Sequence, residues 1–290
     1  MTQRTATRSN QATGAREDAY FIEEAGYELF CVVHRPTTTP QVGVVFCPSL
    51  YAEEQKMYGA QVLTARALAD AGFAAARLHY RGTGHSSGVL DTVTVDAMLE
   101  DVARARVFLE ETTGVKAIGF CGGRFGGLMA ALAAQAHHAV ALILWEPVLD
   151  GRAYFREIFR ASQLSALAGG ASGLRVGSAV DRLREAGTVD VLGSPICLPL
   201  YESAVERKMA DVTLRGPLPT LLIQINPSTQ LKPEYSALKD ALGRGGVNLE
   251  TVLIEGEGAW SFVDSPMPSP HKIAEVTQSW LTRALHHPVS

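Results

Sequence analysis

Short runs of apolar residues alternate along the chain with longer segments in which apolar residues recur at helical spacing. The short runs are typical of buried strands, and the helical repeats are typical of helices that pack on a sheet. The expected strands are 20–23, 29–34, 43–47, 73–79, 115–121, 140–145, 221–225 and 249–254. The expected helices are 61–71, 91–111, 128–136, 233–242 and 273–284. This alternation predicts an α/β fold with a central, mostly parallel sheet and helices on both faces.

Residues 151–216 interrupt the alternation. They contain no clear buried strand, and their pattern predicts loops and two helices, at 152–167 and 200–209. Because the segment lies between two predicted strands, we expect an insertion over the ends of the sheet. This insertion is either a lid over a binding site or a segment with a structural role only. The core would then consist of 19–150 and 217–290.

Composition places the chain among globular proteins with one large domain: it has 290 residues, 47% of them hydrophobic and 19% charged. The net charge of −4 comes without a basic stripe, so no nucleic-acid partner is expected.

Residues 1–18 are polar and lack the apolar core of a secretory signal, which predicts a flexible N-terminal tail. Apolar stretches such as 139–145 are too short to cross a membrane. The four cysteines include no CxxC pair, which favours buried free thiols over disulfides or a metal site and indicates a cytoplasmic location.

Four loops carry the candidate chemistry. Residues 45–54 (VFCPSLYAEE) leave a strand, 78–88 (LHYRGTGHSSG) form a glycine-rich loop, and 118–127 (IGFCGGRFGG) form a tight turn into a helix. Together with 144–151 (LWEPVLDG), they resemble the α/β-hydrolase superfamily, in its serine-aminopeptidase-like and exosortase-system-associated branches. The resemblance spans about residues 20–285. It implies an α/β-hydrolase fold with an eight-stranded sheet and a helical cap, an oxyanion loop at 45–54, and a nucleophile elbow at 118–127.

The elbow can be aligned in two frames. One frame places Arg124 at the nucleophile position, between Gly122 and Gly126. The other places Cys121 there and forces Gly126 and Gly127 into the first helical turns, where each glycine costs roughly 1 kcal/mol against alanine. We therefore favour Arg124. Its guanidinium is a fixed cation that suits a carboxylate, an enolate or a phosphate, but it is no nucleophile.

The other triad positions also lack the expected residues. The loop 226–231 (NPSTQL), where the resemblance places the acid, contains no carboxylate. In the loop 256–262 (GEGAWSF), Trp260 stands where the histidine belongs, and His271 is expected at the start of the last helix. The resemblance therefore implies a degenerate catalytic triad, without the ordinary serine mechanism.

Several other residues should gather with Arg124 at the carboxyl ends of the strands. Glu53 or Glu54 could serve as a general base or could cap the following helix. Glu146 could have a catalytic role or could pair with Arg124 or Arg81. His85 could act as a base or bond within its own loop. The candidate catalytic residues are Arg124, Glu53, Glu54, Glu146, His85 and Cys121, and the candidate substrate-binding residues are Ser49, Leu50, Tyr51, Phe125 and Trp260.

These residues favour an enzyme that acts on a small acyl- or ester-bearing metabolite by a non-serine mechanism. Arg124 would suit an anionic substrate, and an elimination or enolate-type reaction in specialised metabolism fits this chemistry. Two alternatives remain open: a catalytically silent binding protein and a hydrolase that depends on Cys121. The glycines of 81–88 lack the GxGxxG order, so no cofactor is expected. We expect a small-molecule partner and no membrane partner, and a homodimer stays open beside a monomer.

Overall fold

The computed structural model describes residues 2–24, 26–168, 176–214, 216–226, 228–256 and 270–286. Its described strands build a nine-stranded sheet in the spatial order β1-β2-β3-β5-β4-β6-β7-β10-β11. The neighbours from β5 to β11 run parallel, and β1, β2 and β3 form an antiparallel edge next to β5. The strands are β1 (Gln3–Ser9), β2 (Arg16–Glu24), β3 (Tyr27–Arg35), β4 (Val42–Cys47), β5 (Ala74–Leu78), β6 (Ala117–Gly123), β7 (Leu142–Trp145), β10 (Pro219–Ile225) and β11 (Asn248–Ile254).

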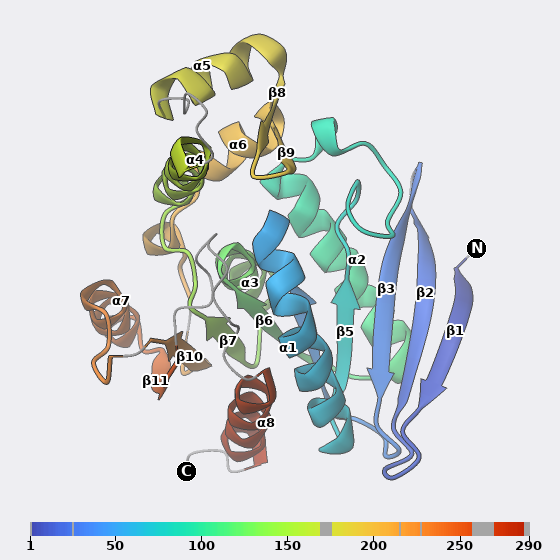
Figure 1. The fold of residues 1–290 in the computed structure, drawn as a ribbon. Helices are drawn as coiled ribbons and strands as arrows, with labels where there is room; N and C mark the ends of the chain where they lie inside the picture. The colour runs from blue at the N-terminus through green and yellow to red at the C-terminus, as the bar shows by residue number, and fades with distance from the viewer. Residues whose placement is uncertain are drawn as a thin grey trace.

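Helices cover both faces of this sheet (Figure 1). One face carries α1 (Tyr51–Asp70) and α8 (Pro270–His286), which pack against each other. The other face carries α2 (Val95–Thr113) and α3 (Phe125–His137), with α7 (Pro233–Arg244) packed into the same apolar cluster. A second apolar cluster lies under α1 and α8. The central strands β4, β5 and β7 are therefore buried along their length and apolar apart from Arg77 of β5, as parallel strands between two helix layers require.

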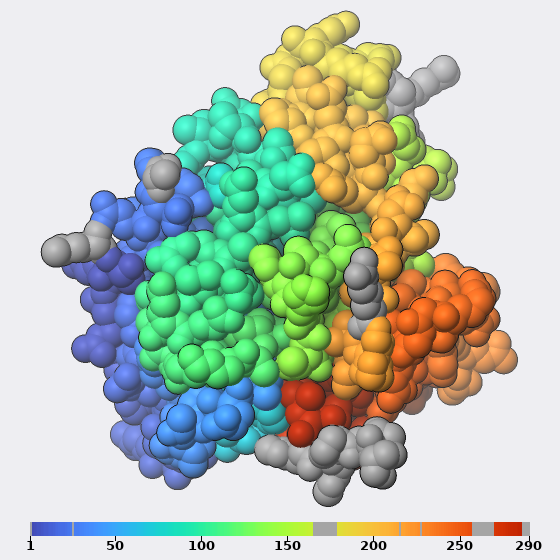
Figure 2. Space-filling model, turned by 180° about the vertical axis from the view of Figure 1, so that it is seen from behind, coloured from blue at the N-terminus to red at the C-terminus, as the bar shows by residue number. Residues whose placement is uncertain are grey.

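The insertion forms a cap above the carboxyl ends of the parallel strands (Figure 1). It consists of α4 (Gly151–Ala168), α5 (Val176–Ala186), the hairpin of β8 (Thr188–Val191) and β9 (Ser194–Cys197), and α6 (Leu198–Val205). The short 3-10 helices η1 (Leu90–Thr92) and η2 (Met209–Asp211) complete the described elements. Figure 2 shows the cap at the top of the molecule, beyond the sheet and its helices. The hairpin was not expected, because each of its strands has four residues with two of them buried, which leaves no apolar run in the sequence.

The prediction of a flexible N-terminal tail is wrong for the described residues. Gln3–Ser9 form β1, which pairs antiparallel with β2 and brings the sheet to nine strands instead of eight. All seven residues of β1 are exposed, so no apolar pattern could signal the strand. Backbone hydrogen bonds hold it, together with a 2.7 Å bond from the Thr7 hydroxyl to the buried Asp18 carboxylate.

Most other predicted elements are confirmed within a few residues, with one long shift. Helix α1 begins at Tyr51, ten residues before the predicted start at 61. Its first turns have too many polar residues to show a helical repeat. The prediction for the cysteines is confirmed, since all four are free and buried. None of the helices in the described ranges is long and apolar enough to cross a membrane.

Candidate functional site

Arg124 lies on the turn between β6 and α3. Its backbone has φ 48° and ψ −122°, a conformation that few non-glycine residues adopt. The Arg124 N–H donates to the carbonyl oxygen of Trp145 over 2.9 Å, and its own carbonyl accepts from Val148 N–H over 2.9 Å. These bonds tie the strained turn to the end of β7 and the loop after it. The structure therefore places Arg124 where the preferred frame expects it.

Close backbone packing explains the glycines on either side of this turn. A Cβ on Gly122 would overlap the carbonyl of Gly126, and a Cβ on Gly126 would overlap the carbonyl oxygen of Cys47. Gly126 and Gly127 both lie in the first turn of α3 although Arg124 occupies the elbow. The argument from the cost of helical glycines was therefore wrong, because close approach to β4 and β7 requires glycine there.

Cys121 does not occupy the turn. It lies within β6, and its side chain has no exposed surface. Burial raises the pKa of the Cys121 thiol well above its ordinary value, with a smaller contribution from Cys47. A thiol with a raised pKa and no exposure is a poor nucleophile. The structure thus gives no geometric support to the Cys121 frame.

The Arg124 guanidinium is held by carboxylates from two directions. Its Nε donates to Glu53 Oε1 over 2.8 Å, and its terminal nitrogen lies 3.6 Å from a Glu157 oxygen on α4. The second Glu53 oxygen accepts from the Tyr154 hydroxyl at 2.8 Å and from the Ser49 hydroxyl at 3.3 Å. This network joins the oxyanion loop, α1, the elbow and the cap helix α4.

The charges of this network are largely enclosed: the side chain of Arg124 is 12% exposed and that of Glu53 is 1% exposed. Burial raises the pKa of Glu53, while Arg124 and the Tyr154 hydroxyl pull it down. Burial alone would lower the pKa of Arg124, but the Glu53 carboxylate raises it, so the guanidinium stays charged. The arginine is therefore a fixed cation, but one that already has an anionic partner.

Glu54 lies beside this network in the first turn of α1. Its Oε2 accepts from Ser49 N–H over 2.7 Å and from the Gln61 amide over 3.0 Å. Burial raises the pKa of Glu54 to about 7, and these hydrogen bonds offset the effect only in part. The Ser49 N–H is thus occupied and is not free to bind a ligand, unlike a donor of the oxyanion loop that the resemblance implies at 45–54.

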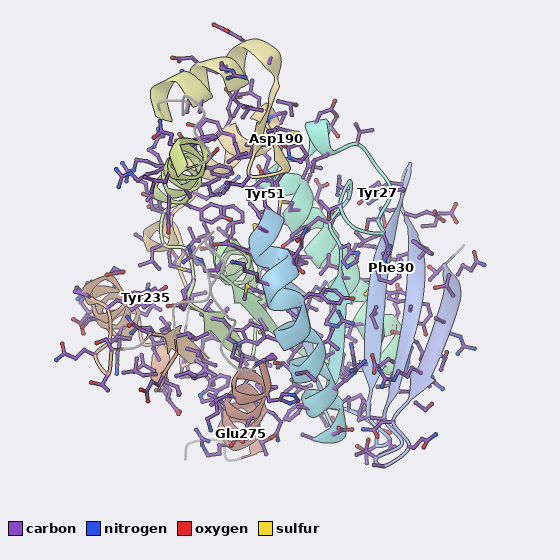
Figure 3. All side chains as sticks on the ribbon, in the orientation of Figure 1. Tyr27, Phe30, Tyr51, Asp190, Tyr235 and Glu275 are labelled. Atoms are coloured by element: carbon purple, nitrogen blue, oxygen red, sulfur yellow. The ribbon has the colours of Figure 1, made fainter. Side chains whose placement is uncertain are left out.

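The larger cavity beside these residues measures about 720 Å³. The predicted substrate-binding residues Ser49, Leu50 and Tyr51 line it, and Glu54 is the only acid among its described lining residues. The glycine-rich loop 82–85 closes one side, and the turn of the β8–β9 hairpin lies over it. In Figure 3, Tyr51 lies at the start of α1 below the cap. The cavity therefore lies between the sheet and the cap.

Arg124 does not line this larger cavity. It lines a smaller one of about 330 Å³ between α4 and α7, together with Lys232 and Tyr235. The described acids on its wall are Asp150, Glu157 and Glu234. Because these acids outnumber the two cations, the described charges do not favour an anion, contrary to our expectation for the surroundings of Arg124.

Glu146 has a different partner from the two that we had considered. Its carboxylate is 1% exposed and accepts from Lys232 Nζ over 3.0 Å. Arg81 instead pairs with Asp101 at 2.8 Å. Burial raises the pKa of Glu146, and Lys232 lowers it. Lys232 was missed, since the sequence shows only a basic residue between the loop 226–231 and the predicted helix 233–242.

The other residues singled out in the sequence lie in different parts of the structure. The His85 backbone N–H donates to His79 Nδ1 over 3.0 Å, so its loop is internally bonded, and both residues line the larger cavity. Phe125 is fully buried, packs against Tyr154 and lines neither cavity. Trp260 lies outside the described residues, so the loss of the triad histidine stays a prediction from the sequence. His271 is exposed in the first turn of α8.

Sequence reasoning also missed His79 and Tyr154. Tyr154 had no signal, because it lies in the insertion and contacts Glu53 only through the tertiary fold. His79 lies within the segment 78–88 that carries part of the resemblance, but as the last residue of the predicted strand 73–79 it was assigned no role. Among the described residues, no group of three or more His, Cys, Asp and Glu side chains could hold a metal ion.

Comparison with known proteins supports the same fold. The sequence model of a family described as serine aminopeptidase, S33 matches residues 42–182. Among solved structures, Est1E from Butyrivibrio proteoclasticus with bound ferulic acid gives a TM-score of 0.65 at 18% identity, covering 92% of this chain and 99% of that one. Mouse alpha/beta hydrolase domain-containing protein 10 gives 0.60 at 16% identity, with 91% and 98% covered. The alpha/beta hydrolase GrgF from Penicillium sp. sh18 gives 0.56 at 16% identity, with 99% and 100% covered. No curated protein matches the chain in sequence.

Proposed function

Because this chain has the α/β-hydrolase fold, and its similarities support an enzyme of that fold, we propose that it acts on a small acyl- or ester-bearing metabolite without a serine nucleophile. The observation that carries the proposal is that Arg124 lies on the turn between β6 and α3, where the resemblance expects the nucleophile, and that its guanidinium is bonded to Glu53. A protonated guanidinium cannot form an acyl intermediate. The nearby Cys121 thiol is enclosed within β6.

The larger cavity is our proposed substrate site. Its volume of about 720 Å³ lies in the ordinary range for small-molecule pockets, and it lies where ligands bind in open α/β sheets. Glu54 lines it with a pKa raised to about 7. A group with this pKa can both accept and return a proton near neutral pH. Glu54 is therefore the proton-transfer group of the proposal.

An elimination or enolate-type reaction fits this arrangement. The Glu54 carboxylate would take a proton from the carbon next to an acyl carbonyl, and the electron pair of that C–H bond would form the enolate. In an elimination, the enolate would re-form the carbonyl and expel a leaving group from the β-carbon with its electron pair. A role in specialised metabolism belongs to the same proposal.

Arg124 enters this proposal as a positioning residue. It contacts Glu53, Glu53 accepts from the Ser49 hydroxyl, and Ser49 lines the cavity and donates its N–H to Glu54. The cation would hold the oxyanion loop through these bonds. Loss of Arg124 should therefore shift the pKa of Glu54, because an unpaired Glu53 carboxylate would lie beside it.

Exchange of the α-proton in deuterium oxide tests the proposal, because it detects enolate formation even when the natural substrate is not known. The probes are methyl phenylacetate and methyl 3-acetoxybutanoate, and the readout is proton NMR across the pH range. Glu54→Gln should reduce enzyme-dependent exchange by about 100-fold or more. Glu206→Gln, which alters an exposed acid of the cap, is the matched control. Arg124→Met should shift the pH at which exchange is half-maximal, and Arg124→Lys should shift this pH less.

Two results would oppose the proposal. Equal exchange by the wild type and Glu54→Gln would remove Glu54 from the reaction. Stoichiometric labelling of Ser49 by a serine-directed phosphonate, with turnover of p-nitrophenyl esters, would show that an unconventional serine is the nucleophile.

A catalytically silent binding protein is the second candidate. It is favoured by the saturation of the polar groups at the elbow: Arg124 is paired with Glu53, and the Ser49 N–H with Glu54. This candidate predicts saturable binding of the ester probes with no deuterium exchange in any variant. The hydrolase that depends on Cys121 is not proposed, because its thiol is fully buried.

A further inference from the structure

His79 follows β5 and is enclosed by the loop that comes after it. The His85 N–H donates to His79 Nδ1 over 3.0 Å, and the Ser86 hydroxyl donates to the His79 carbonyl over 2.6 Å. The His79 N–H donates to the carbonyl of Phe30 on β3 over 3.0 Å. The residue is thus held on its backbone and on one ring nitrogen by its own loop and the neighbouring strand.

Gly84 is what allows the loop to approach the imidazole so closely. It has φ +55°, and a Cβ at this position would overlap the His79 ring, with Nδ1 as the nearest atom. Aromatic rings restrict the other sides: Phe30 lies 5.1 Å away, His85 5.3 Å and Tyr58 6.2 Å between centroids. The imidazole therefore has one fixed orientation, with Nδ1 turned toward the loop.

This arrangement also determines which nitrogen carries the proton. A backbone N–H can donate only to an unprotonated nitrogen, so the neutral ring must carry its proton on Nε2. Among the hydrogen bonds of the described residues, the His79 side chain takes part in one, at Nδ1, and none involves Nε2. His79 lines the larger cavity, so Nε2–H is the polar group that this ring has left for a ligand there.

The surroundings keep this ring neutral. Burial, then His85 of the loop and Arg77 of β5, lower the pKa of His79 to about 4. On the side of α1, the neighbouring groups are Tyr58 and, on the wall of the same cavity, Glu54. The ring is thus uncharged throughout the pH range in which Glu54 titrates.

We propose that His79 is a neutral hydrogen-bond donor, whose Nε2–H binds the carbonyl oxygen of an acyl compound in the larger cavity. The inference rests on the proposed function, since it places the acyl group in this cavity. It supplies the donor that the Ser49 N–H cannot provide, because Glu54 occupies it. A neutral donor strengthens its bond as negative charge develops on the oxygen, and it does not compete with Glu54 for the proton.

Nitrogen NMR tests the tautomer without any ligand. In the ¹⁵N-labelled full chain, which has 8 histidines, the signals lost in His79→Phe identify His79. They should show a bare Nδ1 and a protonated Nε2, unchanged from about pH 5 to about pH 8. A protonated Nδ1, or a titration within this range, would overturn the proposal.

The donor role is tested with 4-dimethylaminocinnamaldehyde, whose visible absorbance moves to longer wavelength when its carbonyl is polarised. Binding to the wild type should produce this red shift. His79→Phe, which keeps a flat ring without a donor, should bind the probe but abolish the shift. His79→Gln, with an amide N–H near the position of Nε2, should restore part of it. A purely structural role would not distinguish these two variants by colour.

Other outcomes separate this inference from the proposed function. A red shift that survives in His79→Phe but disappears in His85→Ala would assign the donor to His85 and overturn the inference alone. Saturable binding without any shift would do the same. If the wild type does not bind the aldehyde, or if cavity-lining variants leave its binding unchanged, then both the acyl site and the role of His79 fail.

Discussion

The buried pair of Arg124 and Glu53 allows a sharp prediction about stability. The Glu53 side chain is 1% exposed, and in Arg124→Ala its carboxylate would keep only the Tyr154 and Ser49 hydroxyls as partners. Removing one member of a buried ion pair typically costs about 3–5 kcal/mol, so we expect Arg124→Ala to lower the free energy of unfolding by this amount. Arg152→Ala is the matched control, since its pair with Glu206 is 58% and 71% exposed, and we expect a change within about 0.5 kcal/mol.

The same variant should show a characteristic dependence on pH. Arg124 lowers the pKa of Glu53, so its removal raises that pKa further above the ordinary value of 4.5. A raised carboxyl pKa means that the folded state binds more protons than the unfolded state within this range. The free energy of unfolding of Arg124→Ala should therefore fall more steeply than that of the wild type between about pH 5 and about pH 8.

Urea unfolding followed by circular dichroism at several pH values measures both effects. Glu53→Gln combined with Arg124→Ala should recover part of the loss and remove the additional pH dependence, because no buried carboxylate remains. The reasoning is refuted if Arg124→Ala unfolds at the same urea concentration as Arg152→Ala, with the same pH profile as the wild type. That result would mean that the cation contributes nothing to holding Glu53.

Three further predictions concern other parts of the site. Glu54→Gln should reduce the loss of stability that the wild type shows as the pH rises from about 4.5 through about 7, because the raised pKa of Glu54 contributes to that slope. Urea unfolding across the pH range measures the slope, and an unchanged slope contradicts the assignment. Iodoacetamide should not label Cys121 in the native protein at neutral pH but should label it in urea, as intact and peptide mass spectrometry would show; native labelling would mean that β6 opens. Gly126→Ala should lower the free energy of unfolding by about 1–3 kcal/mol, because its Cβ meets the Cys47 carbonyl. Gly59→Ala, in an open stretch of α1, should raise it by about 0.5–1 kcal/mol, and equal effects of the two changes would refute the packing argument.

The alternation of apolar runs and helical repeats was sufficient to predict the parallel part of the sheet and its helix layers. It succeeded because strands buried on both faces, such as β4 and β7, must be apolar throughout. The resemblance likewise implied an elbow at 118–127. Its glycines are explained by the structure, because only glycine permits the start of α3 to approach Cys47 and Pro147 so closely.

The sequence could not reveal β1, because a fully exposed edge strand is held by backbone hydrogen bonds that any residue can make. The partners of the charged residues were equally hidden. Whether Arg124 would meet Glu53, and Glu146 would meet Lys232, depends on how α1 and the loop after β10 approach the elbow. The neutral state of His79 depends on burial and on a glycine that admits a backbone N–H to its ring. Residue types and spacing thus determined the architecture, whereas the tertiary structure decided which charges meet and which nitrogen holds a proton, because those depend on distances between segments far apart in the chain.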